Sequence, residues 1–329
     1  MVKAIRVYKF GAPEVMKLED VELGEPKNNE IKVKIKAIGV NYSDVYMRKG
    51  LLLVYIQSLP YTPGLELAGV VIAVGSEVTT CKLGDVVAYA GFPVSAYAEE
   101  QILPADKVVL VPSSIDPIVA AAALFKGLTA EVLVRRCFKV LPEHTILFHA
   151  AAGGVGSLAC QWANALGATV IGTVSTKEKA VQAKEDGCHH VIIYKEENFV
   201  DRVMEITSGK GVDVVYESIG KDTFQSSMAC LKINGHIVVY GMASGEHEPI
   251  GFRQIAEKGI YYTAPSMTLY TKERNNLLAA SGELFSNIEK GVLRVRVNHK
   301  YPLSQAAQAH SDIENRKTTG SIVLLPDEN

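Results

Sequence analysis

Cysteine is scarce in this chain, and its spacing excludes a disulfide framework and a zinc-finger type of metal site. The 329 residues include only five cysteines, an odd number. They stand far apart, and no two of them have the C-x-x-C spacing typical of a zinc site. We therefore predict reduced, largely buried thiols and no bound metal. The five are Cys81, Cys137, Cys160, Cys188 and Cys230.

An excess of positive charge is also missing. Lys and Arg number 34 against 36 Asp and Glu, which gives a net charge of −2. Nucleic acid and anionic membrane are therefore poor partners, and we expect neither. No uninterrupted apolar run reaches the roughly 18 residues of a membrane-spanning helix. Met1–Arg6 begins with strand-like alternation instead of a signal-peptide core, so we expect a cytoplasmic protein.

What is present is enough apolar sequence for two folded domains. Residues 1–110 contain short strands at regular spacing, which predicts a barrel-like β domain. Ile31–Ile38 alternates apolar residues with lysines, as a half-buried antiparallel strand does. Asn41–Lys49 predicts one short helix with Asn41 or Ser43 as its N-cap. A long helical stretch, Ile118–Phe138, has Gly127 near its middle, where we expect a kink or break.

From residue 144 onward, strand and helix patterns alternate. This period predicts a parallel sheet covered by helices on both faces. Residues 294–300 and 321–325 then have strand character again, so we expect the chain to return to the first domain. The strands expected in the alternating region are Thr145–His149, Thr169–Val174, His190–Tyr194, Val212–Glu217, His236–Met242 and Gly259–Thr263.

The segment Ala150–Gly156, which reads A-A-A-G-G-V-G, joins the first of these strands to a helix. A glycine turn at this place lets a diphosphate approach bare backbone at a helix N-terminus, where N–H groups and the helix dipole favour negative charge. A tight turn without a ligand is the alternative. We interpret His149, just before the turn, as structural. The chain has no pattern resembling a hydrolytic triad.

The second strand of the alternating region ends without a carboxylate. An acidic residue there would bond the adenosine ribose of NAD, whereas hydroxyls and cations suit the 2′-phosphate of NADP. Here Val174 and Ser175 occupy the strand end, and Lys179 follows. Tyr194, at the end of the third strand, would lie over the same edge. The alternative is that Ser175 and Thr176 only cap the next helix.

Several motifs together resemble the zinc-free quinone oxidoreductases, the zeta-crystallin branch of the medium-chain dehydrogenase/reductase superfamily. The resemblance runs from Met1 to about Pro326. The motifs are Gly39–Gly50, Pro63–Gly69, Lys126–Ala130, and Phe148–Gly156 with Ala159–Ala163. The zinc-dependent relatives have Cys where Asn41–Ser43 stands and His where Leu65 stands, and Leu65 cannot bind zinc. Zinc-assisted alcohol oxidation is therefore not expected.

The resemblance implies a GroES-like β-barrel domain with an inserted Rossmann domain, a doubly wound parallel sheet. The barrel domain would comprise residues 1–125 and 266–329, and the Rossmann domain residues 126–265. The implied cofactor is NADPH. The implied catalytic residues are Tyr46, Asn41 and Lys126. The implied cofactor-binding residues are Asn41, Tyr46, Thr129, Gly153, Gly154, Val155, Gly156, Ser175, Lys179, Tyr194, Ser218, Tyr240, Gly241 and Arg316.

The function implied is NADPH-dependent reduction of quinones. An NADPH-dependent enoyl or alkenal double-bond reductase is the alternative on the same scaffold, and a non-catalytic, crystallin-like NADPH-binding protein is another. The partners expected are a small quinone or enone substrate and a second copy of the chain, paired through the edge strand near Gly259–Thr263. Residues 51–62 are more apolar than is usual for the family, which leaves the acceptor open.

Overall fold

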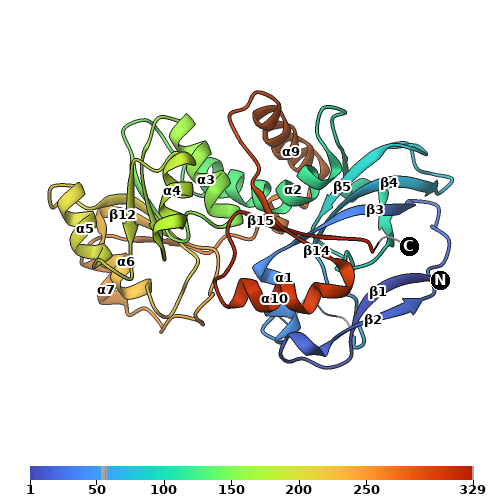
Figure 1. The fold of residues 1–329 in the computed structure, drawn as a ribbon. Helices are drawn as coiled ribbons and strands as arrows, with labels where there is room; N and C mark the ends of the chain where they lie inside the picture. Colours follow the sequence, from blue (N-terminus) through green and yellow to red (C-terminus); the bar gives the residue numbers. More distant parts are fainter. Residues whose placement is uncertain (53–55, 57, 328–329) are drawn as a thin grey trace. The chain divides into compact units, whose positions relative to one another are not determined.

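Figure 1 shows the computed structural model, which describes residues 1–52, 56 and 58–327. The chain forms two compact units. Unit 1 comprises Met1–Leu128, Thr271–Gly291 and Val295–Asn329, and unit 2 comprises Thr129–Tyr270 and Val292–Arg294. The chain thus leaves unit 1, builds unit 2 and returns.

Unit 1 is built on a mixed sheet with the strand order β14-β15-β3-β4-β5-β7, and β6 also pairs with β3. β14 and β15 are parallel, and the remaining pairs are antiparallel. β1 and β2 form a separate hairpin. The strands are β1 (Val2–Val7), β2 (Met16–Val21), β3 (Glu30–Val40), β4 (Glu66–Val74), β5 (Val86–Ala90), β6 (Glu100–Pro104), β7 (Val108–Leu110), β14 (Val297–Pro302) and β15 (Ser321–Leu325).

The alternation predicted for Ile31–Ile38 is present in β3. Ile31, Val33 and Ile35 are buried, while Lys34 and Lys36 are exposed. Period-two alternation places one set of side chains on the core face and the other in water. Each buried aliphatic side chain stabilises the fold by about 1.5–3 kcal/mol, so this face fixes the register of the strand.

The helices of unit 1 are α1 (Tyr42–Arg48), α9 (Arg274–Glu289) and α10 (Ala306–Glu314), together with most of α2 (Pro117–Glu131), which continues into unit 2. Of the kink or break predicted at Gly127, the break is absent, because α2 continues through this residue. A Cβ atom at Gly127 would lie 2.4 Å from a methyl carbon of Leu284 on α9. Gly127 therefore permits two helices to pack closely. The helix instead changes to a π-helix at Val132–Cys137.

Among the residues that the structure describes, one helix is long and apolar enough to cross a membrane, namely Pro117–Cys137, and 72% of its most apolar window is buried inside the protein. No uninterrupted apolar run indicated it, because Lys126 and Glu131 stand within it. Burial on this scale is typical of the core helix of a soluble protein.

Unit 2 contains a six-stranded, wholly parallel sheet with the order β10-β9-β8-β11-β12-β13. Counted from β8, this is the order 3-2-1-4-5-6 of a Rossmann fold, and the order reverses between β8 and β11. The predicted fold class is therefore confirmed. The strands are β8 (Thr145–Phe148), β9 (Thr169–Val174), β10 (His190–Ile193), β11 (Val212–Glu217), β12 (Leu231–Val239) and β13 (Tyr261–Thr263).

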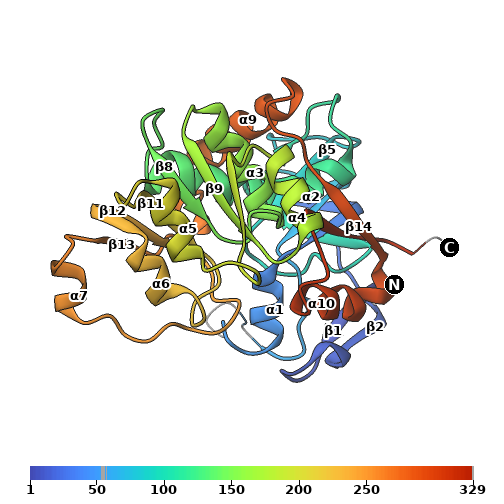
Figure 2. The same ribbon diagram turned by 60° about the vertical axis from the view of Figure 1, so that its left-hand side comes forward.

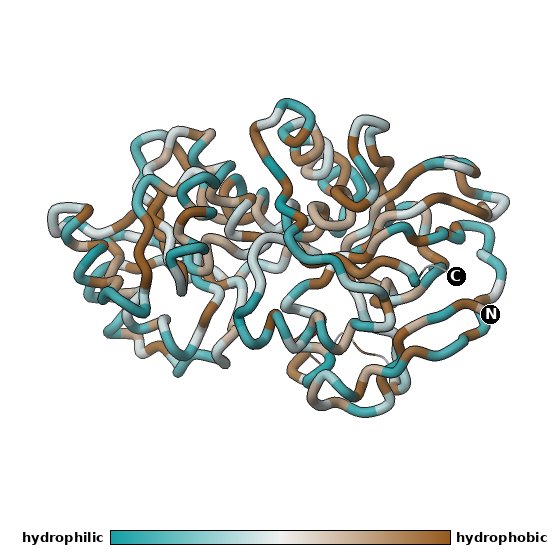
Figure 3. Tube along the Cα trace, in the orientation of Figure 1, coloured by the Kyte–Doolittle hydropathy of each residue, from teal (hydrophilic) through white to brown (hydrophobic). Residues whose placement is uncertain are grey.

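Helices cover both faces of this sheet. α3 and α4 lie on one side and α6 and α7 on the other (Figures 1 and 2), as right-handed crossovers in opposite directions require. Brown, apolar residues follow the central strands in Figure 3, and all six residues of β11 are buried. The helices are α3 (Gly154–Ala165), α4 (Lys177–Glu185), α5 (Phe199–Ile206), α6 (Phe224–Ala229), α7 (Phe252–Ala256) and α8 (Met267–Tyr270).

The apolar segment 51–62 lies partly outside the described residues, which omit 53–55 and 57. Of the rest, Leu51 is 56% and Leu59 40% exposed, whereas Tyr61 is only 7% exposed. The described residues of this segment thus include both exposed and buried apolar side chains.

Candidate active site

The glycine turn lies at the carboxyl ends of the strands, beside the reversal of strand order in unit 2. β8 pairs with β11 up to Phe148 and Tyr216, and the turn follows directly. Ala150 takes a left-handed conformation with φ of 53°. A Cβ atom on Gly156 would lie 2.4 Å from the carbonyl oxygen of Ala150. No side chain fits there, so the backbone of the turn is bare.

The same turn starts helix α3, with Gly153 as its N-cap. The N–H groups of a first helical turn have no acceptor within the helix. In α3 these belong to Gly154, Val155 and Gly156, and the first turn has no acidic side chain. This glycine-rich backbone at the positive end of a helix fits a diphosphate.

A set of hydroxyl and ammonium groups follows β9 and β10. Ile193 at the end of β10 pairs with Val174 at the end of β9, and the N–H of Tyr194 donates to the carbonyl of Val174 at 3.1 Å. Ser175 and Tyr194 thus leave neighbouring strands at the same edge. Lys179 lies in the first turn of α4, one turn further along the chain.

The capping alternative holds for only one of the two hydroxyl residues. Thr176 is the N-cap of α4, and its Oγ1 accepts from the N–H of Lys179 at 3.3 Å. Glu178, the acidic residue in that turn, interacts with its own N–H and with Thr176, and these contacts lower its pKa. Ser175 is half-buried and has no capping role. Its place at the strand end fits the 2′-phosphate prediction.

Ser218, Tyr240 and Gly241 form a third set, in the turns after β11 and β12. The N–H of Tyr240 donates to the carbonyl of Glu217 at 2.9 Å. A Cβ atom on Gly241 would lie 2.9 Å from the carbonyl oxygen of Ser218. The two turns are therefore packed backbone to backbone.

Asn41 and Lys126 meet in unit 1, at a residue that the sequence analysis did not select. The carboxylate of Glu66 on β4 is fully buried. Its Oε2 accepts from Lys126 Nζ at 2.7 Å and from Asn41 Nδ2 at 3.0 Å, while Oε1 accepts from the N–H of Phe125 at 2.7 Å. Glu66 thus fixes both predicted residues. A lone carboxylate within an apolar strand was the signal that could have identified it.

The predicted helix after β3 is present as α1, and Asn41 is its N-cap, as one of the two predicted alternatives required. The N–H of Asn41 donates to Asp44 Oδ2 at 2.9 Å. The backbone N–H of Asn41 is thus bound within the helix turn, while its side-chain Nδ2 donates to Glu66. Tyr46 lies on the same helix, is 8% exposed, and has its ring centroid 5.1 Å from that of Tyr42.

Behind α1 lies a buried chain of polar groups, also missed by the sequence analysis. The Tyr97 hydroxyl is hydrogen-bonded to Asp44 Oδ2 at 3.2 Å and to His310 Nε2 at 2.9 Å. Burial raises the pKa of Asp44 to about 7, and burial together with the Arg48 guanidinium lowers the pKa of His310 to about 3. His310 lies on α10, so the chain joins α10 to α1.

Arg316 lies in the turn after α10, in unit 1. Its backbone is left-handed, with φ of 59°. Burial and the Glu314 carboxylate raise the pKa of Tyr42, and the Arg316 guanidinium opposes them, so Arg316 lies near α1. Thr129, half-buried on α2, is the first residue of unit 2 and lies outside the three sets of that unit.

No group of three or more His, Cys, Asp or Glu side chains is placed to hold a metal ion within residues 1–52, 56 and 58–327. Position 65, where a zinc ligand stands in the zinc-dependent relatives, is a buried leucine.

Family models match both units. The alcohol dehydrogenase GroES-like domain matches residues 27–113, and the zinc-binding dehydrogenase model matches residues 154–280. A protein of Pseudomonas aeruginosa named quinone oxidoreductase is 45% identical over 327 residues, covering 99% of this chain and 100% of its own. A 2-haloacrylate reductase from a Burkholderia species is 42% identical over 333 residues, covering 99% of each chain.

The structure is also similar to solved ones. The crystal structure of Escherichia coli quinone oxidoreductase complexed with NADPH superposes with a TM-score of 0.96 at 44% sequence identity. The match covers 98% of this chain and 100% of the other.

Proposed function

Since the chain belongs to the quinone oxidoreductases of the medium-chain dehydrogenase/reductase superfamily, we propose that it oxidises NADPH and reduces quinones without zinc. The observation that carries the proposal is that unit 2 has both a glycine turn after β8 and no acidic residue at the end of β9. The first fits a diphosphate and the second fits a 2′-phosphate. When bound, NADPH supplies a hydride from nicotinamide C4.

The predicted site residues would have the following roles. Gly153–Gly156 would bind the diphosphate, and Ser175, Lys179 and Tyr194 the 2′-phosphate. Asn41, Thr129, Ser218, Tyr240, Gly241 and Arg316 would complete the cofactor shell. Lys126 would contact the substrate with a charge that Glu66 holds in place. Tyr46 would donate a proton at the quinone oxygen, with water as the competing donor.

An acceptor assay tests this function. We expect steady oxidation of NADPH, followed at 340 nm, with 1,4-benzoquinone and little with 2-alkenals. Faster turnover of 2-alkenals would support the alternative double-bond reductase, which the likeness to a 2-haloacrylate reductase favours. Tight NADPH binding without oxidation by either acceptor would support the non-catalytic alternative.

Replacing Lys179 with alanine is expected to weaken NADPH binding by about 10–100-fold, the effect of one lost charge-assisted hydrogen bond. NADH affinity should stay unchanged, because NADH has no 2′-phosphate. Lys177→Ala is the matched control, since Lys177 is exposed in the same helical turn. Dissociation constants from nicotinamide fluorescence measure both. An equal loss for NADH and NADPH would contradict the predicted preference.

Replacing Tyr46 with phenylalanine is expected to lower kcat for benzoquinone by about 10²–10⁴-fold, the usual contribution of a positioned acid. The NADPH dissociation constant should change far less than kcat, because the aromatic ring of Tyr46, an implied cofactor contact, is retained. Tyr42→Phe, on the same helix, is the control. Unchanged turnover of Tyr46→Phe would assign the proton to water.

We also propose a cytoplasmic homodimer in which β13 of each copy pairs with the other. β13 is an edge strand, and Tyr261 and Tyr262 on it are 56% and 39% exposed. An apolar open edge favours pairing with another strand. Sedimentation equilibrium tests this. With a net charge of −2, we propose no nucleic-acid partner and no membrane partner.

A further inference from the structure

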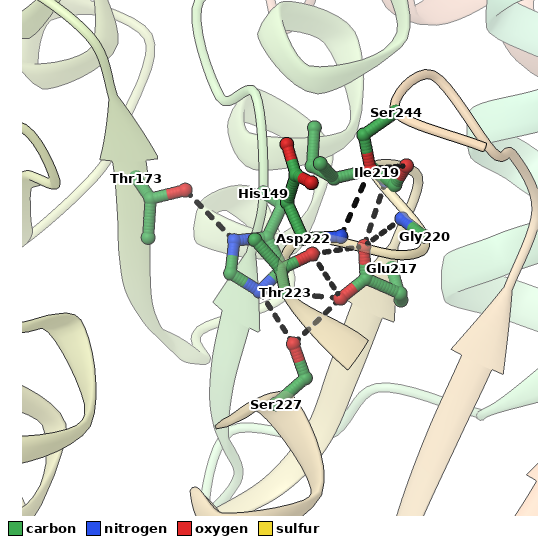
Figure 4. A network of polar contacts seen from close by, with 9 residues as sticks. All are labelled: His149, Thr173, Glu217, Ile219, Gly220, Asp222, Thr223, Ser227 and Ser244. Carbon is green, nitrogen blue, oxygen red and sulfur yellow. Dashed lines mark hydrogen bonds and ion pairs between the residues drawn. The ribbon is translucent and has the colours of Figure 1, made fainter. Parts of the chain in front are cut away.

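A buried polar network connects the carboxyl ends of three strands in unit 2, and its side chains are not among the predicted cofactor contacts. We call it the His149–Glu217 network, and Figure 4 shows it. Its members are His149 after β8, Thr173 on β9, Glu217 on β11, and Thr223 and Ser227 at the start of α6. His149, Thr173, Glu217 and Ser227 are at most 2% exposed.

The Glu217 carboxylate receives only donors. Its Oε1 accepts the backbone N–H groups of Ile219 at 2.7 Å and Gly220 at 3.1 Å. Thr223 Oγ1 donates at 2.9 Å, and Ser227 Oγ donates to Oε2 at 2.6 Å. The turn after β11 is therefore wrapped around a buried carboxylate that accepts hydrogen bonds from all four of these groups.

The hydrogen bonds of Ser227 indicate which nitrogen of His149 carries a proton. Because Ser227 gives its single proton to Glu217, its oxygen must accept from His149 Nε2, 2.9 Å away. Burial lowers the pKa of His149, which favours the neutral imidazole with its proton on Nε2. In that form Nδ1 accepts from Thr173 Oγ1 at 2.9 Å.

The network also adjoins the two turns that carry Ser218, Tyr240 and Gly241. The carbonyl of Ser218 accepts from the N–H of Ala243 at 3.1 Å, and the carbonyl of Ile219 accepts from the N–H of Ser244 at 2.7 Å. The carbonyl of Thr173 accepts from the N–H of Ala151, in the glycine turn, at 3.1 Å. The ends of β8, β9 and β11 are thus joined through a single set of side chains.

We infer that Glu217 and His149 are positioning residues, which hold the Ser218 turn and the glycine turn in the conformation that binds the cofactor. This inference rests on the proposed NADPH-dependent function. A turn held in its bound conformation loses less entropy on binding, so the network raises affinity for NADPH without touching it. Its loss should weaken cofactor binding, while KM for the acceptor stays unchanged.

Three variants test this inference. His149→Leu removes both hydrogen bonds of the imidazole, whereas His149→Gln keeps one donor and one acceptor on the same side chain. In Glu217→Gln, an amide N–H donor would face the N–H and hydroxyl donors that bind the carboxylate. We expect NADPH dissociation constants raised by about tenfold or more in His149→Leu and Glu217→Gln, and within about twofold of the parent in His149→Gln.

Asp213→Asn is the matched control, because Asp213 lies at the opposite end of β11 and accepts from the N–H of Thr145 at 2.8 Å. It should lower the melting temperature without changing the NADPH dissociation constant. The inference fails if His149→Leu binds NADPH as the control does, or if His149→Gln binds no better than His149→Leu. Should Glu217→Gln not fold, the two His149 variants decide alone. Failure of the parent protein to bind NADPH would overturn the proposed function instead.

Discussion

Replacing Glu66 with alanine is expected to lower the free energy of unfolding by about 3–5 kcal/mol, because one partner of a buried ion pair is removed. The ammonium of Lys126, itself 4% exposed, would lose its 2.7 Å partner in the interior. The Asn41 amide and the N–H of Phe125 would lose their acceptor as well. Urea unfolding followed by circular dichroism measures the effect.

A second substitution makes this prediction sharper. In the Glu66→Ala background, Lys126→Met removes the unpaired buried charge and should restore part of the lost stability. In the parent background, the same substitution should destabilise the protein, since it leaves the buried Glu66 carboxylate without its cation. The change in the free energy of unfolding caused by Lys126→Met thus has opposite signs with Glu and with Ala at position 66. A double variant less stable than Glu66→Ala would contradict the burial of the charge.

Asp44→Asn and His310→Gln are expected to change the pH dependence of stability in opposite directions. The pKa of Asp44 is raised on folding to about 7, so its stabilising contribution is full below pH ~4 and is lost as the pH rises to 7. The pKa of His310 is lowered to about 3, so its contribution is full above pH ~6.5 and is lost as the pH falls. In the parent protein the two slopes oppose each other.

When one group is removed, the dependence of stability on pH should follow the other group alone. Relative to the parent, Asp44→Asn should gain and His310→Gln should lose stability as the pH rises from 4 to 6.5. Each change should approach about 1.4 kcal/mol per pH unit. Arg48, Lys126 and Glu66 also influence one or the other pKa and remain in both variants. Denaturation midpoints at pH 4.5, 5.5 and 6.5 measure the slopes. Parallel curves for the two variants would contradict the assigned pKa directions.

The parts of the molecule that could be predicted from sequence depend on neighbours along the chain. The glycine turn is defined within seven residues, and the N-cap Asn41 within four. Strand and helix periods likewise extend over short windows, which is why the parallel sheet was predicted correctly. The ends of strands are predicted less accurately from sequence. The strand expected at Gly259–Thr263 is present only as Tyr261–Thr263.

The parts that were missed depend on contacts between distant residues. A kink or break was predicted at Gly127 because nothing local to it indicates that Leu284 packs against it. The role of Glu66 requires that β4 lie against both α1 and α2, and Lys126 is 60 residues away in sequence. His310 meets Tyr97 across 213 residues. Hydrogen-bond partners at such separations leave no periodic signal.

The return of the chain to unit 1 sets an order on its synthesis. β15 lies inside the sheet, between β14 and β3, and its residues Ile322, Val323 and Leu324 are at most 2% exposed. Domains fold as they leave the ribosome, amino-terminal parts first. Here unit 2 leaves the ribosome whole while the sheet of unit 1 still lacks these strands, and Ile38, Gly39 and Val40 of β3 are without their β15 partner. The amino-terminal unit of this protein is therefore the last to be completed.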